Sequence, residues 1–69
     1  MIWYIVQLKD PALFLTDGNV QVMLSEETKE PKSFLSMESA YAWAESVGLV
    51  IDGKYLLVIN RDTQEIANV

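Results

Sequence analysis

The side chains capable of acid–base or nucleophilic chemistry in this chain of 69 residues are carboxylates and serines. Glu26 and Glu27 are adjacent, and Glu38 and Glu45 stand seven residues apart. A carboxyl group serves as a general acid or base when a pocket moves its pKa toward the operating pH. Nothing in the sequence predicts that these glutamates are buried, so we do not expect them to be catalytic.

Nucleophilic and metal chemistry lack their usual side chains, because the chain contains no His and no Cys. Their absence excludes Ser–His and Cys–His pairs, thiolate metal sites and disulfides. A Ser–Lys pair with Lys32 or Lys54 is the remaining arrangement, but neither S-x-x-K nor G-x-S-x-G occurs. The glycines form no phosphate-binding motif, and the acidic residues lack EF-hand spacing. We therefore expect a protein that is not an enzyme and holds no metal or cofactor.

The charge balance points toward protein partners. Ten carboxylates stand against five basic residues, a net charge of −5. Nucleic-acid binding needs Lys and Arg to neutralise phosphates, so we expect no direct nucleic-acid contact. Two interpretations remain open: charge that prevents aggregation, and an acidic face directed at a basic protein partner. The second interpretation rests on Glu26, Glu27, Glu30, Glu38 and Glu45.

The first half of the sequence predicts three strands. Residues 2–9 alternate, with a wholly apolar set at the even positions, and an Asp-Pro pair ends the run. Residues 12–16 and 19–24 predict a hairpin around the Asp-Gly pair at 17–18, because Asp-Gly favours a type I′ turn. Residues 25–32 contain no apolar residue besides proline and predict a solvated loop.

An amphipathic helix is predicted over residues 37–47. Ser36 is placed to cap its first turn, Glu38 lies where the helix dipole favours a carboxylate, and Gly48 follows where a left-handed residue ends a helix. The arc predicted to face inward consists of Met37, Ala40, Tyr41, Trp43, Ala44 and Val47.

The end of the chain completes the expected fold. Residues 54–60 predict a strand that is apolar on both faces, and residues 62–69 a flexible tail, frayed or weakly joined to the sheet. The order is then β-β-β-α-β. We expect one α+β domain over residues 1–69, with one helix packed on one face of a small antiparallel sheet of three to four strands.

A single helix covers only one face of such a sheet. The residues expected on the uncovered face are Trp3, Ile5, Phe14 and Met23. An exposed apolar patch of this size marks an interface. A small chain without disulfides or metal gains stability from association, so we expect a homodimer that forms through these residues or through an edge strand of the sheet.

The sequence predicts a cytoplasmic protein without membrane contact. Its apolar runs are too short to span a bilayer. Its N-terminus lacks the basic region and cleavage site of a signal peptide. The absence of cysteine fits a reducing compartment, which is the host cytoplasm if a phage encodes the protein.

One local resemblance involves the helix entry. The segment K-S-F-x-S-x-E-x-A-x-x-W-A, residues 32–44, resembles the K-x-F-x-T-x-E-x-A-x-x-F segment of RNase H hybrid-binding domains, which are β-β-β-α modules. The basic and aromatic nucleic-acid surface of that family is not visible in this chain. The net charge also has the opposite sign, so we do not carry that function over.

A broader resemblance concerns the type of protein. The W-Y-I-V strand, the D-G hairpin, the F-x-S-x-x-x-A helix entry and the short last strand resemble the small accessory proteins of bacteriophages and prophages. Inhibitors of host defence or host enzymes, including anti-CRISPR proteins, are common among them. The resemblance implies a binding protein that inhibits a host defence or nucleic-acid-processing protein through its acidic surface. The alternative is a homodimeric structural or assembly protein without a host target, and a nucleic-acid-binding module is the least favoured reading.

Overall fold

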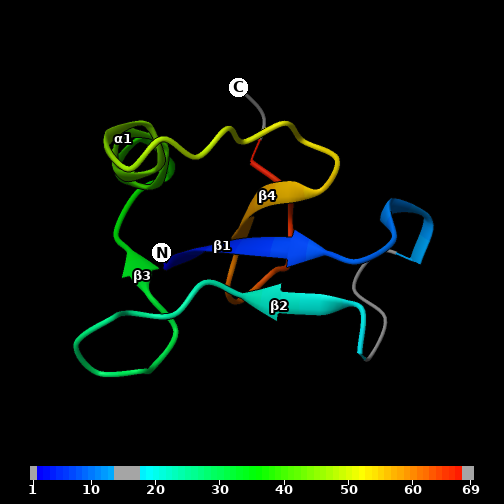
Figure 1. Ribbon diagram of the computed structural model, residues 1–69, viewed down its shortest axis with the longest axis horizontal. Coiled ribbons are helices and arrows are strands. Elements are labelled where there is room, and N and C mark those ends of the chain that lie inside the picture. Colours follow the sequence, from blue (N-terminus) through cyan, green and yellow to red (C-terminus); the bar gives the residue numbers. More distant parts are fainter. Residues whose placement is uncertain (1, 14–17, 68–69) are drawn as a thin grey trace.

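The computed structural model describes residues 2–13 and 18–67 of the chain. Its elements in chain order are β1 (Trp3–Leu8), the 3-10 turn η1 (Pro11–Leu13), β2 (Val20–Val22), β3 (Ser33–Phe34), α1 (Met37–Ser46) and β4 (Leu56–Asn60). The predicted α+β class and the order β-β-β-α-β are confirmed, with four antiparallel strands and one helix (Figure 1).

Every other strand of the sheet pairs with β1. Strand β4 lies along residues 3–7 of β1, β2 pairs with residues 6–8, and β3 pairs with residues 3–4. Because a strand has two edges, β2 and β3 share the edge that β4 does not occupy. The pairing of β3 with the start of β1 places the beginning of α1 next to the same end of the sheet.

Helix α1 packs on the odd-numbered face of β1. Trp3 and Ile5 of β1, which are 9% and 0% exposed, pack in one cluster with Ala40 and Ala44 of α1 and Val58 of β4. The two alanines let the helix approach the sheet closely. The register supports this face, since Ile5 lies opposite Val58.

The prediction of an uncovered apolar patch is therefore wrong for Trp3 and Ile5. Trp3 and Ile5 lie beneath the helix, and Met23 is half-buried against the same cluster. Phe14 lies outside the described residues. Both faces of β1 are apolar near its start, so alternation alone does not tell which face the helix covers.

The even-numbered face of β1 has a second apolar cluster of its own. Val6 and Leu8 are buried with Leu57 and Ile59 of β4. The half-buried side chains that pack against them are Tyr4, Val20 and Val22. Figure 1 shows β4 crossing β1 at a steep angle, so the sheet is strongly twisted and its own strands help to enclose this cluster.

The predicted hairpin between residues 12–16 and 19–24 is wrong. Pro11–Leu13 forms a 3-10 turn in which the Leu13 N–H donates to Asp10 O at 3.0 Å, and β2 pairs with β1 instead. The buried side chain of Asn19 fastens the connection, since its Oδ1 accepts the Asp10 N–H at 2.8 Å and its Nδ2 donates to Asp10 O at 3.0 Å. Residues 14–16 of the predicted hairpin strand and Asp17 of its turn lie outside the described residues.

The helix signals in the sequence are confirmed. Ser36 is the N-cap, and its Oγ accepts the N–H of Ser39 at 3.1 Å. Gly48 takes a φ of +78°, which is the left-handed conformation expected after a helix. Of the arc predicted to face inward, Val47 is 52% exposed, because it follows the last residue of the helix.

The chain after β4 returns to the sheet. Asn60 Oδ1 accepts the N–H groups of Asp62 and Thr63 at 2.9 and 3.0 Å, which turns the backbone back on itself. Ile66 then forms a bridge with Ile59, and the Ala67 N–H donates to Val58 O at 2.8 Å. The tail through residue 67 thus extends the sheet beyond β4.

The turn before β4 is organised by Asp52. Its Oδ1 accepts the N–H groups of Lys54, Tyr55 and Leu56, each at 2.9 Å. These hydrogen bonds, above all the one from Leu56, hold the pKa of the Asp52 carboxyl below its ordinary value.

This turn generates a prediction about pH. Because the folded-state pKa of Asp52 lies below the unfolded-state value, its contribution to stability is complete above the unfolded pKa and is lost as the pH falls through the folded pKa. We expect the free energy of unfolding, measured by urea denaturation, to decrease below about pH 4. Asp52→Asn keeps an acceptor oxygen and should reduce that decrease. An identical pH profile for Asp52→Asn and the unsubstituted protein would contradict the role of Asp52.

The packing of α1 on the odd-numbered face generates a second prediction. Ile5→Val removes one buried methyl group and should lower the free energy of unfolding by about 0.5–1.5 kcal/mol in urea denaturation. Ile66→Val makes the same chemical change at a side chain that is 44% exposed, and should stay within about 0.5 kcal/mol. Equal effects of the two substitutions would show that Ile5 does not lie in the core.

Candidate functional site

A hydrogen-bonded turn projects from the sheet edge shared by β2 and β3. Its base is closed by the bridge between Leu24 and Pro31 and by the Ser25 N–H, which donates to Glu30 O at 2.8 Å. The Ser25 Oγ also accepts the Glu27 N–H at 3.3 Å. The predicted loop over residues 25–32 is thus an ordered turn at residues 25–30, and β3 begins at Ser33 (Figure 1).

An open groove of about 280 Å³ lies between the turn and helix α1. We call it the turn–helix groove, and its lining residues are Leu24, Ser25, Glu26, Glu27, Lys32, Trp43 and Val47. Its volume is near the lower limit for small-molecule sites. It contains both exposed apolar side chains, such as Leu24 at 51% exposure, and exposed carboxylates.

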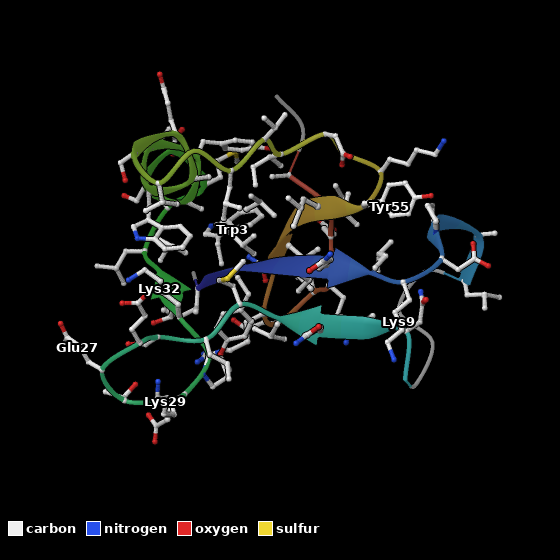
Figure 2. All side chains as sticks on the ribbon, in the orientation of Figure 1. Trp3, Lys9, Glu27, Lys29, Lys32 and Tyr55 are labelled. Carbon is white, nitrogen blue, oxygen red and sulfur yellow. The ribbon has the colours of Figure 1, made fainter. Side chains whose placement is uncertain are left out.

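The cationic group of the groove lies over aromatic rings. The Lys32 Nζ is 5.2 Å from the ring centroid of Trp43 and 5.6 Å from that of Phe34. The two rings are 5.8 Å apart and inclined by 49°. Figure 2 shows Lys32 between the turn and α1, while Glu27 points outward from the turn. A cation in this position is attracted by the negative faces of both rings.

The carboxylates of the groove have no such partner. Glu26 and Glu27 are exposed, and the only ion pair within residues 2–13 and 18–67 joins Arg61 and Asp62 at 3.2 Å, away from the groove. The aromatic rings therefore hold the nearby ammonium group of Lys32 while the two carboxylates remain available to a cation from another molecule.

Glu38 and Glu45 form a second acidic group on α1. They are two turns apart on the same exposed side of the helix, whereas Trp43 of the groove lies on a different side. Tyr41 lies between them along that flank, half-buried against the core, and its burial raises the pKa of its hydroxyl. The structure thus separates this pair from the groove.

The predicted acidic residues accordingly form two groups. Glu26 and Glu27 line the turn–helix groove, and Glu30 lies at the end of the same turn. Glu38 and Glu45 lie on the outer flank of α1, so the five do not make one continuous face.

Sequence reasoning did not find Lys32 and Trp43 as site residues. The sequence pattern places Lys32 in a solvated loop and Trp43 on the inward arc of the helix. The signal that connects them is the spacing K-x-F followed by a tryptophan in the helix: strand β3 turns Phe34 inward, and Lys32 and Trp43 then meet above its ring.

Two other kinds of site find no support among the described residues. Residues 2–13 and 18–67 contain no group of three or more acidic side chains positioned to hold a metal ion. In the same part of the chain, no helix has the length and apolar character needed to cross a membrane.

The cation–π contact generates a prediction. Lys32→Gln removes the charge above Trp43 and Phe34, and should lower the free energy of unfolding by about 0.5–1 kcal/mol, the usual contribution at a partly exposed site. Urea denaturation followed by tryptophan fluorescence measures this change. The control is Lys29→Gln in the exposed turn, which should have a smaller effect. If Lys29→Gln lowers stability as much as Lys32→Gln does, the two rings contribute nothing specific.

Comparison with known proteins adds no relative to this description. No protein-family model matches the chain, no curated protein matches it, and no solved structure matches it. The resemblances to hybrid-binding domains and to phage accessory proteins therefore rest on sequence pattern alone.

Proposed function

We propose that this protein is a non-enzymatic binding protein that inhibits a host defence or nucleic-acid-processing protein, in the manner of small phage inhibitors. Its exposed glutamates would occupy a basic surface that otherwise holds nucleic acid. The observation that supports the proposal most is the presence of exposed carboxylates without a cationic partner among the described residues, next to exposed apolar side chains.

This combination suits protein binding better than the other classes considered. An apolar surface surrounded by charge is typical of protein interfaces. A net charge of −5 repels phosphates, which argues against a direct nucleic-acid contact. Carboxylates that face a basic surface mainly accelerate association and select the partner, so a small protein gains specificity from them at little cost in stability.

The homodimer alternative loses its expected contact surface. The expected contact surface consists of Trp3, Ile5, Phe14 and Met23. Trp3 and Ile5 lie in the core beneath α1. We therefore propose a partner other than a second copy joined through this patch.

Charge reversal tests the proposal. A host protein captured by the wild-type chain is identified, and its association rate constant is measured by biolayer interferometry. We expect Glu26→Lys/Glu27→Lys or Glu38→Lys/Glu45→Lys to reduce that rate constant about tenfold or more, because the charges then repel a basic surface. The reduction should shrink as salt is added.

The matched control changes the same charge elsewhere. Asp62→Lys/Glu65→Lys makes an equal change in net charge in the exposed turn after β4. Its effect on the association rate should be smaller than that of either acidic group. Unchanged binding of the host protein by both test variants, or equal losses in all three, would contradict a role for these acidic surfaces.

A further inference from the structure

We propose that the turn–helix groove is the part of the acidic surface that makes the specific contact, and that it receives an arginine side chain from a basic segment of the partner protein. The inference rests on the proposed function and deepens it, because it names the side chain that is recognised and the residues that recognise it.

The groove offers an arginine both of the environments that its side chain needs. Leu24 at the base of the turn and Val47 at the end of α1 are 51% and 52% exposed, and they provide apolar contacts for the methylene groups. Glu26 and Glu27 line the groove on the side of the turn, with Glu27 pointing outward at its rim (Figure 2), and they provide carboxylates for the guanidinium. Arginine donates paired hydrogen bonds to carboxylates and is weakly hydrated, so it suits a partly apolar groove better than lysine does.

Lys32 does not neutralise these carboxylates, and the reason is geometric. Its ammonium group lies 5.2 and 5.6 Å from two ring centroids and forms no ion pair with a described carboxylate. At a partly exposed site a cation–π contact and an ion pair have comparable energies, of about 0.5–1 kcal/mol. With two rings available to it, Lys32 remains on the aromatic side, and the groove keeps a net charge of −1 from its two glutamates and one lysine.

The groove is also built firmly enough to select its ligand. The turn that carries Glu26 and Glu27 is closed by the bridge between Leu24 and Pro31 and by the hydrogen bond from Ser25 to Glu30. The opposite wall is a helix capped at Ser36 and packed on the sheet through Ala40 and Ala44. Little ordering of the backbone is then required when a side chain enters.

The test uses a defined peptide and the whole chain. The probe is acetyl-Gly-Leu-Arg-Leu-Gly-amide, and the matched probe carries citrulline, which has the shape of arginine without its charge. Titration is followed by ¹⁵N-resolved NMR of the protein. We expect the arginine peptide to shift the amides of residues 24–27 and the indole N–H of Trp43, and to leave that of the buried Trp3 unchanged.

The expected affinities separate charge from apolar contact. The citrulline peptide should bind about fivefold more weakly, which corresponds to about 1 kcal/mol. The double variant Glu26→Gln/Glu27→Gln should weaken binding of the arginine peptide by a similar factor, because it removes the two negative charges. The substitutions leave the backbone hydrogen bonds of the turn in place. The matched variant Glu38→Gln/Glu45→Gln should bind within about twofold of wild type, because its glutamates lie on the other flank of α1.

Three results would overturn the inference. They are the absence of shifts in the groove at about 10 mM peptide, equal affinity for the arginine and citrulline peptides, and an equal loss of affinity in the two glutamine variants. Each leaves the proposed function open, since a host protein could still depend on Glu38 and Glu45. Conversely, unchanged host binding in both charge-reversal variants would contradict the proposed function, and with it the groove as the specific contact, even if the groove selects the arginine peptide.

Discussion

Strand β1 is hydrogen-bonded to all three other strands, and both of its faces are buried. Ile5 on one face and Val6 on the other have no exposed surface. The two apolar clusters of this small domain both form against β1, so its apolar burial is concentrated around one strand. The helix, the other strands and the returning tail all pack or pair against β1 or its direct neighbour β4, so the position of every other element depends on that strand.

The turn–helix groove is a consequence of this arrangement. The pairing of Trp3 with Phe34 sets the position of β3, and β3 in turn sets where Lys32 leaves the sheet and where α1 begins. Phe34 then lies beneath both Lys32 and Trp43. The same two residues of β3 thus join the core to the surface feature for which we propose a function.

The groove illustrates how intramolecular contacts determine which charges are available for binding. A lysine beside two glutamates is expected to pair with them, and such a surface ion pair contributes at most about 1 kcal/mol. In this protein two aromatic rings attract the lysine with comparable energy and in a fixed direction. The carboxylates therefore stay exposed, and the local charge differs from what a simple count of neighbouring residues suggests.

Patterns among neighbouring residues predict the strand around Ile5, the helix from its Ser36 cap to Gly48, the last strand and, from their order, the α+β class. The composition alone excludes histidine and cysteine chemistry. Alternation, capping and turn preferences act over a few residues, so they can be read directly. The folded chain alone shows that α1 covers Trp3 and Ile5 and that β2 pairs with β1. It also shows that Lys32 lies over Trp43 and that the five glutamates divide into two groups. These features depend on contacts between segments that are distant in sequence. When a strand is apolar on both faces, its pattern does not tell which face the helix covers, and only the packing of the whole chain selects that face.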